Sequence, residues 1–385
     1  MPSGFTTIDE EFGTIDLDDV YITDAWLIDQ YVGNGLWSWG QNSGGKLGLL
    51  NVTDRSSPVQ VGVLTNWRQI SAGGHSAAVK TDGTLWGFGG NTSGQLGVGN
   101  VTNRSSPTQV GLLTNWRQVD NGGAHGVAIT TTGALWAWGF NDAGQLGVGN
   151  VTNRSSPTQV GLLTNWRQVS AGGYSAAVKT DGTLWTWGTA GNGGLGINTI
   201  TAHRSSPVQV GLMTNWRQVS VGELHTAAIK TDGTLWLWGD NTYGQLGDNS
   251  TTHRSSPIQV GSLTNWKQVS SGGRTTACVK TDGTLWLWGR NTYGGLGLLN
   301  VAHRSSPVQV GSLTNWKLVS CGNYHAAAIK TNGTLWIWGY NFAGQLGLLN
   351  IVHRSSPVQV GTLTNWKQVE CGDSHTLAIP FADIT

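Results

Sequence analysis

The feature that most constrains this chain is a motif, L-W-x-W-G, that returns seven times at spacings of 49 to 51 residues. The copies begin at Leu36, Leu85, Leu135, Leu184, Leu235, Leu285 and Leu335, and one of them has Phe88 for its second Trp. Two further motifs, R-S-S-P and T-N-W, keep the same period. Such self-similarity is typical of repeat proteins, in which each unit buries its apolar face against the next. The 385 residues are therefore expected to form one body.

The composition favours a stiff and well-packed core. The chain contains 58 Gly and 21 Trp, and only 11% of its residues are charged. Regularly placed Trp, Leu, Val and Ile supply the apolar area that disordered Gly-rich chains lack. Because each Trp buries roughly 150–250 Å², the repeats can stabilise one another.

One repeat unit, followed from Trp216, predicts four short antiparallel strands. They cover residues 217–221, 225–230, 235–239 and 257–260. Residues 231–234, T-D-G-T, form a tight hairpin turn with Gly where a positive φ is needed. No stretch shows a 3.6-residue period, so helices are not expected.

The third strand of the unit is expected to be covered on both faces. Side chains alternate along a strand, which places Trp236 and Trp238 on one face and Leu235 and Leu237 on the other. Four-stranded units with two-sided burial, in seven copies, predict an all-β, seven-bladed β-propeller of four-stranded antiparallel blades.

The repeat also resembles that of a known family. The pattern G-x-L-W-x-W-G-x-N-x-x-G-Q-L-G, followed by P-x-x-V and V-x-x-G-x-x-H-x-x-A-I, is similar to the repeat of the regulator of chromosome condensation family. The resemblance covers about residues 33–380 and implies a seven-bladed propeller with the V-S-x-G strand near the axis. The repeats start at L-W-S-W-G and finish at residues 375–379. The last blade must therefore pair N-terminal with C-terminal strands, which removes an open sheet edge.

The first residues differ from everything after them, and we expect an acidic arm at 1–24 before a propeller at 25–385. Residues 1–30 contain eight of the 21 acidic residues and no Lys or Arg. Apolar residues within the arm are Phe12, Ile15, Leu17, Val20 and Tyr21. They favour an arm that docks on a partner or on another subunit, and a disordered terminus is the alternative.

The remaining charge is spread over the repeats. Net charge is +1, and the chain beyond the acidic segment carries 22 basic against 13 acidic residues. The basic residues recur singly in each repeat, which indicates a solvated rim, because a nucleic-acid site needs clustered charge. The N-terminus lacks a signal-peptide pattern, and no apolar run approaches membrane-spanning length. These patterns predict a cytoplasmic or virion protein.

Residues at repeated positions are expected to be structural. His225, His325 and His375 share one repeat position, so they point alike from different blades and do not converge as metal ligands must. We expect them to hydrogen-bond between blades. The Trp residues expected to pack the blades include Trp37, Trp39, Trp86, Trp136, Trp138, Trp236 and Trp238. An enzyme needs an asymmetric constellation, and the sequence predicts no catalytic residue, metal or cofactor.

Asymmetry lies in the loops that follow W-G. The candidate binding residues there are Phe140, Asp240, Tyr243, Arg290, Tyr293, Tyr340 and Phe342. Aromatic and Arg residues on an otherwise uniform ring are typical of a binding surface. Neutral drift in exposed loops is the alternative.

These observations predict a non-enzymatic binding or structural protein. The specific hypothesis is a phage virion, tail or capsid surface component that docks through its arm and presents the ring to a protein or a host glycan. The alternative is a soluble bacterial protein–protein interaction scaffold or inhibitor of the same family. A small-GTPase exchange factor, which the resemblance also implies, is less expected because the even repeat length leaves no room for a wedge-like insertion. No nucleic-acid partner is predicted, and the oligomeric state stays open.

Overall fold

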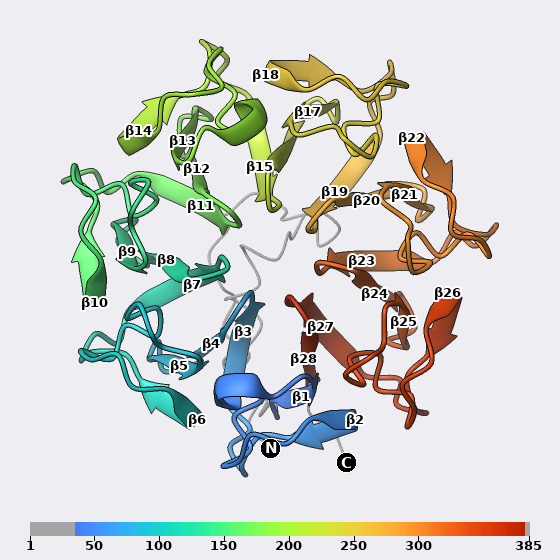
Figure 1. Ribbon diagram of the computed structural model, residues 1–385, viewed down its shortest axis with the longest axis horizontal. Coiled ribbons are helices and arrows are strands. Elements are labelled where there is room, and N and C mark those ends of the chain that lie inside the picture. The colour runs from blue at the N-terminus through green and yellow to red at the C-terminus, as the bar shows by residue number, and fades with distance from the viewer. Residues whose placement is uncertain (1–34, 382–385) are drawn as a thin grey trace, which may run out of the picture.

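The protein forms a ring of seven four-stranded antiparallel sheets around a central axis (Figure 1). The computed structural model describes residues 35–381. The predicted arm at 1–24, its boundary with the propeller and the docking residues Phe12, Ile15, Leu17, Val20 and Tyr21 lie outside this part. Within it, the seven-bladed all-β propeller expected from the repeats is confirmed.

Two strands of each blade lie closest to the axis. The innermost begins at the Trp of T-N-W: β3 (Trp67–Ala72), β7 (Trp116–Asn121), β11 (Trp166–Ala171), β15 (Trp216–Val221), β19 (Trp266–Ser271), β23 (Trp316–Cys321) and β27 (Trp366–Cys371). The second consists of small and branched residues: β4 (Ser76–Lys80), β8 (His125–Thr130), β12 (Ser175–Lys179), β16 (His225–Lys230), β20 (Thr275–Lys280), β24 (His325–Lys330) and β28 (His375–Pro380). Every described side chain of β16 is buried, as expected for a strand between two neighbouring blades.

The two outer strands follow a hairpin turn and a Gly-rich loop. The third carries L-W-x-W-G: β1 (Trp37–Gly40), β5 (Leu85–Gly89), β9 (Leu135–Gly139), β13 (Leu184–Gly188), β17 (Leu235–Gly239), β21 (Leu285–Gly289) and β25 (Leu335–Gly339). The fourth begins at R-S-S-P: β2 (Arg55–Gln60), β6 (Arg104–Gln109), β10 (Arg154–Gln159), β14 (Arg204–Gln209), β18 (Arg254–Gln259), β22 (Arg304–Gln309) and β26 (Arg354–Gln359). The described helices are two short 3₁₀ turns, η4 (Ser43–Gly45) and η5 (Gly191–Gly193).

The fourth strand differs from the sequence prediction, which placed it at residues 257–260. In the structure β18 starts three residues earlier, at Arg254, and it is the edge of its sheet. Its register against β17 shifts between the Leu237↔Ile258 and Gly239↔Arg254 pairs. Pro257 therefore lies in a bulged part of an edge strand, where its missing N–H leaves no ladder bond unmade.

The core lies between adjacent blades. Trp216 and Trp238 pack with Val178 and Leu184 of the preceding blade, and all four side chains are buried. Trp238 also donates from Nε1 to the main-chain oxygen of Gly194 in that blade, at 2.8 Å. Each blade thus shields its neighbour's indoles, and the alternation predicted for β17 is confirmed, because Trp236 and Trp238 both contact Trp216.

The other predicted structural Trp residues repeat this arrangement. In the six motifs that have a second indole, this indole is buried and bonded to the preceding blade, as Trp39 is to Gln345 O and Trp138 to Gln95 O. The first indole is half-buried and meets the inner Trp edge-on. These pairs are Trp37 with Trp366, Trp86 with Trp67, Trp136 with Trp116 and Trp236 with Trp216.

Histidines of the second strand lie between blades. His225 Nε2 is 3.0 Å from Thr276 Oγ1 of the next blade, and His325 makes the same contact with Thr376. His375 Nε2 lies 2.8 Å from Ser76 Oγ, between the blade that contains both termini of the described chain and the blade that follows it. Burial lowers the pKa of His225 to about 4, so this ring is neutral at physiological pH.

The ring is closed by strands from both ends of the described chain. The seventh sheet has the order β2-β1-β28-β27, and β1 pairs with β28 through contacts such as Trp37↔Ala378. This pairing of N- and C-terminal strands confirms the closure predicted from the sequence. It gives β1, the third strand of its blade, a partner and so removes an open sheet edge. Within residues 35–381, no helix is long and apolar enough to cross a membrane.

Candidate binding surface

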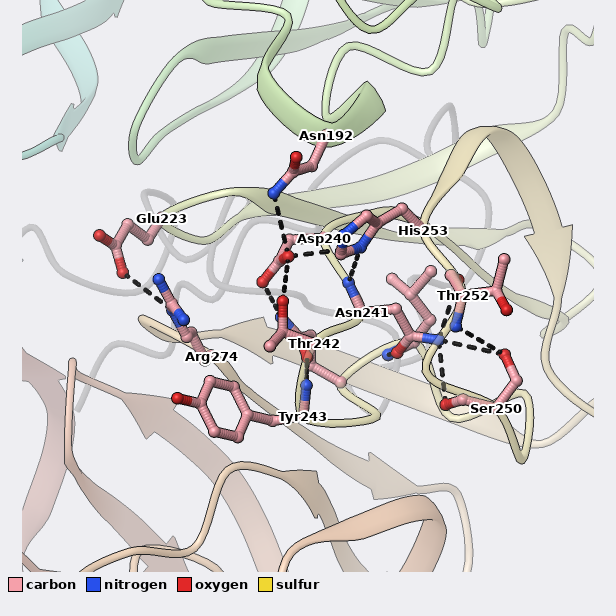
Figure 2. Close-up of polar contacts among 12 residues, drawn as sticks. Asn192, Glu223, Asp240, Asn241, Thr242, Tyr243, Ser250, Thr252, His253 and Arg274 are labelled. Atoms are coloured by element: carbon pink, nitrogen blue, oxygen red, sulfur yellow. Dashed lines mark hydrogen bonds and ion pairs between the residues drawn. The ribbon is translucent and has the colours of Figure 1, made fainter.

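The loops that follow W-G are held by one repeated asparagine. Asn241 Oδ1 accepts the N–H of Leu246 at 2.9 Å, while its Nδ2 donates to the carbonyls of Ser250 and Thr252 at 3.1 Å (Figure 2). Asn91, Asn141, Asn291 and Asn341 bind their loops in the same way. The side chains on either side of this asparagine therefore project from a rigid frame, and they are the ones that vary between blades.

Three neighbouring blades bring their variable aromatic residues together. The ring centroids of Tyr293 and Tyr340 are 4.7 Å apart, and Phe342 stacks on Tyr340 at 6.4 Å. Tyr324 lies 5.8 Å from Tyr293. His353 meets Tyr340 at 4.8 Å. Phe342 is 69% exposed, so the cluster reaches solvent.

Two arginines extend this cluster. The Arg290 guanidinium lies over the rings of Tyr324 and Tyr243, at 4.6 and 5.2 Å from their centroids. Arg274 lies 5.4 Å from the Tyr243 centroid and 3.8 Å from the Glu223 carboxylate (Figure 2). Cation–π contacts hold these side chains in place while leaving guanidinium N–H groups available to acceptors. Burial and, to a lesser extent, the charge of Arg290 lower the pKa of His303, which packs on Tyr243.

We call this set the aromatic–arginine patch. It consists of Tyr243, Arg274, Arg290, Tyr293, His303, Tyr324, Tyr340, Phe342 and His353. Five members are among the binding candidates found from the sequence. Arg274 and Tyr324 were missed because they precede the repeated His position rather than follow W-G; comparing that column between repeats would have found them. His303 and His353 belong to a different repeat position, directly before R-S-S-P.

Two of the sequence candidates lie elsewhere. Phe140 is half-buried in the β7–β10 blade, on the other side of the ring from the patch (Figure 1). Asp240 follows W-G but is only 1% exposed. Its carboxylate accepts hydrogen bonds from Asn192, Thr242 and Gln245 (Figure 2). Asp240 therefore ties two loops together and offers little surface to a partner.

The axis of the ring contains a second candidate site, a channel with a cavity of about 660 Å³. Its wall is built from the inner strands, so each repeat position forms a ring of seven residues (Figure 1). Six glutamines of the wall bind the strand of the next blade: Gln168, for example, donates to Val219 O and accepts from Val219 N, both at 2.8 Å. Leu318 replaces this glutamine in one blade. The wall is therefore a repeated amide belt with one gap.

Two carboxylates break the symmetry of the channel. Asp120 and Glu370 stand where the other blades have Ser71, Ser170, Ser220, Ser270 and Ser320. Burial raises the pKa of Asp120 to about 6, although hydrogen bonds from Ala171 N and Ser71 Oγ oppose the shift. Burial and the charge of Asp120 raise the pKa of Glu370 to about 8. Both keep part of their surface open to the channel. The sequence reading missed this pair, which a position-by-position comparison of the repeats reveals.

Seven basic residues surround one end of the channel. They directly follow the Trp of T-N-W and are Arg68, Arg117, Arg167, Arg217, Lys267, Lys317 and Lys367. We call them the cation ring. The sequence predicted a solvated rim for repeated basic residues; the structure differs because inner strands converge on the axis. The Lys before T-D-G also differs from the predicted solvated rim, because Lys230 is only 6% exposed and lies 3.8 Å from the Trp236 centroid.

The aromatic–arginine patch and the cation ring lie on opposite faces. His225 pairs with Gly239 at the end of the blade where the W-G loops begin, whereas Trp216 pairs with Lys230 at the other end. Among residues 35–381, no group of three or more His, Cys, Asp or Glu side chains is placed to hold a metal ion.

This geometry defines a closed seven-bladed β-propeller with one asymmetric face and a charged axial channel. Comparison with family models identifies the family to which this propeller belongs. The RCC1-like domain matches residues 164–380, and the regulator of chromosome condensation (RCC1) repeat matches residues 34–79, 82–129 and 132–178. The chain belongs to the RCC1 repeat family.

Solved structures show the same fold. Yeast RCC1 (Prp20), in a complex with Kap60, is 18% identical, with a TM-score of 0.85 over 100% of this chain and 97% of that chain. Human WBSCR16 is 24% identical, with a TM-score of 0.81 over 91% of this chain and 100% of that chain. Prp20p from Saccharomyces cerevisiae, described with its binding to Gsp1p and histones, is 19% identical, with a TM-score of 0.82 over 92% and 93% of the two chains. A search of curated protein sequences finds no match to the chain.

Proposed function

We propose that this propeller is a non-enzymatic binding module that takes a protein partner on the aromatic–arginine patch. The observation that carries the proposal is the convergence of nine aromatic, imidazole and Arg side chains from three blades on a ring that is otherwise nearly uniform. Tyr and Arg dominate the binding energy of protein interfaces, because they bury large areas while keeping polar groups for the partner. A rigid loop frame lowers the entropy lost on binding.

The chemistry of the patch favours a protein with an acidic rim. Arg274 and Arg290 flank the aromatic residues, and their guanidinium groups match carboxylates geometrically. Relatives of the same fold support a protein partner: yeast RCC1 (Prp20) is bound to Kap60 in one structure, and Prp20p is described with Gsp1p and histones in another. A neutral glycan, which belongs to the other partner class expected from the sequence, would use the aromatic rings and would not need the charge of the two arginines.

The test is affinity purification of the full chain from a native extract, with wild type compared with Tyr293→Ala and Tyr340→Ala. We expect the same specific partner with wild type and with Phe140→Ala, a control on a distant blade, and its loss with either patch variant. Melting temperatures check that the variants stay folded. Retention of every partner by both patch variants would sink the proposal.

Assignment to a phage particle remains a separate prediction from the sequence. Its basis is the acidic arm, which lies outside the described residues, and no observation on the ring favours it over a soluble scaffold or inhibitor. The distinguishing experiment is deletion of residues 1–24 followed by a measurement of particle incorporation. Unchanged incorporation would contradict docking through the arm.

A further inference from the structure

The blade of β19 to β22 lacks two side chains that most repeats place beneath the W-G loop. Gly295 stands where four blades have a glutamine, and Thr275 stands where five blades have a histidine. The blade of β11 to β14 also has a glycine at the first of these positions, Gly194, but there Tyr174 fills the space: a Cβ on Gly194 would lie 2.5 Å from the Tyr174 hydroxyl oxygen. Within residues 35–381, only the blade of β19 to β22 combines small residues at both positions.

A small pocket occupies this space, and we call it the Gly295 pocket. Its lining includes Thr275, Arg290, Tyr293, Gly295 and Tyr324, and its volume is about 10 Å³. A volume of that order holds about one water-sized group. Arg290, Tyr293 and Tyr324 also belong to the aromatic–arginine patch. The pocket therefore lies within the surface that we propose for a protein partner.

The missing glutamine leaves a main-chain donor without its usual acceptor. In the preceding blade, Gln245 Oε1 accepts the N–H of Tyr243 at 2.9 Å, and Gln345 Oε1 accepts that of Ala343 at 3.0 Å. Tyr293 is the equivalent of Tyr243, and no residue of the described chain accepts its N–H. Because an unpaired N–H in a protein interior costs free energy, an oxygen from solvent or from a partner is favoured at this place.

The charge on the other side of the missing amide is inverted. Gln245 Nε2 donates to the Asp240 carboxylate at 2.5 Å, and the residue at the repeat position of Asp240 in the pocket blade is Arg290. Cation–π contacts within the patch hold the Arg290 guanidinium, which forms no salt bridge within residues 35–381. The Gly295 pocket thus presents donors on both sides, and a group that fits it must bring two acceptor oxygens.

We propose that the Gly295 pocket binds the side-chain carboxylate of an Asp or Glu residue on the protein partner. One oxygen accepts the N–H of Tyr293, as a glutamine Oε1 does in other blades, and the second accepts from the Arg290 guanidinium. A carboxylate has the shape of the missing amide but accepts at both ends, and its charge is opposite to that of Arg290. This inference rests on the proposed function and adds the chemical group that anchors the partner.

The first experiment needs no partner and uses acetate, the simplest carboxylate, as the probe. The full chain is labelled with the heavy nitrogen isotope at its seven Tyr residues, and the amide signals are followed by NMR. Sodium acetate is compared with sodium chloride at equal ionic strength. The variants Tyr293→Phe and Tyr243→Phe assign the two signals that matter.

We expect acetate to shift the Tyr293 amide signal at millimolar concentrations. The Tyr243 amide signal should stay at its position in chloride, because Gln245 already accepts that N–H. Gly295→Gln should remove the response of Tyr293, since the new glutamine fills the pocket, and Arg290→Gln should weaken it. Equal shifts of both amides, or an undiminished response of Tyr293 in both variants, would overturn the proposal.

The second experiment uses the partner obtained by affinity purification. Gly295→Gln fills the pocket and keeps every side chain of the aromatic–arginine patch, Arg290→Gln removes the charge, and Arg154→Gln removes a charge from an outer strand of a distant blade. We expect both pocket variants to bind the partner at least about tenfold more weakly than wild type, because charge-assisted hydrogen bonds are the strong ones. The Arg154 variant should bind as wild type does.

Melting temperatures separate lost binding from lost structure. We expect Gly295→Gln to be at least as stable as wild type, because it fills a cavity and restores the hydrogen bond to the loop. Loss of the partner with Tyr340→Ala but unchanged affinity in both pocket variants would overturn the carboxylate site and leave the proposed function standing. Retention of the partner by every patch variant would contradict both.

Discussion

Trp39 donates a hydrogen bond from its indole Nε1 to the main-chain oxygen of Gln345 at 2.9 Å, although 306 positions separate the two residues. The same strand, β1, pairs along its length with β28. The first and the last described strands thus share one sheet, and the Trp39 indole joins that sheet to the preceding blade. Closure of the ring depends on this seam, because β1 has no other partner on that side.

Truncation after Gly372 removes β28 and is expected to cause aggregation. The edge of β1 loses its partner, and the buried Trp39 loses the strand beside it, so an apolar edge is open to other chains. Size-exclusion chromatography and the melting temperature measure the effect. Truncation after Phe381, which leaves β28 intact, is the control and is expected to behave as wild type. A soluble monomer with the parent's melting temperature after the first truncation would contradict closure by the seam.

Most of the fold was predictable from the sequence because the same pattern of strands and turns recurs in seven repeats. Alternation in L-W-L-W-G placed both indoles of β17 on one face, and the order of motifs required the seam. The start of β18 was not predictable from alternation, because the bulge around Pro257 interrupts the period of two.

The candidate site was predictable only in part. Differences between repeats identified Tyr293 and Tyr340, but their contact depends on how adjacent blades are rotated in the ring. Asp240 varies in the same column and yet turns inward, because Gln245 and Asn192 supply hydrogen-bond donors there. The repeat position of a residue predicts the direction in which its side chain can project. Its local hydrogen-bond partners determine whether the side chain reaches the surface or is buried.

Gly233→Ala is expected to destabilise the ring far more than Gly261→Ala. Both glycines have positive φ, 76° and 61°, so each substitution costs about 1 kcal/mol of backbone strain. A Cβ at Gly233 would lie 2.0 Å from Thr264 O, whereas a Cβ at Gly261 meets nothing within 4 Å. Relieving that overlap with the main chain of the next blade adds roughly 1–3 kcal/mol. Denaturant unfolding of the two variants measures the difference. Equal losses in the free energy of unfolding would contradict a tight contact between the T-D-G turn and the main chain of the next blade.

Glu370→Gln is expected to stabilise the ring at high pH and to flatten its pH dependence. The folded-state pKa of Glu370 is raised from 4.5 to about 8, so between these values the folded state keeps a proton that the unfolded chain has lost. The stability that the bound proton contributes therefore falls as pH rises through this window, and this contribution is lost in full above pH 8. Water in the channel screens the charge, and we expect about 2 kcal/mol, seen as a melting temperature a few degrees lower at pH 9 than at pH 5.

Two further variants separate the buried charge from other causes of that pH dependence. Glu223→Gln removes an exposed carboxylate and is expected to leave the slope as in wild type. Asp120→Asn removes the charge that helps to raise the pKa of Glu370, so the fall in stability should end at lower pH and be smaller. If Glu370→Gln and wild type melt in parallel from pH 5 to pH 9, the carboxylate is ionised at little cost. The channel must then hydrate it more fully than its contacts with Ser320 and Gln368 indicate.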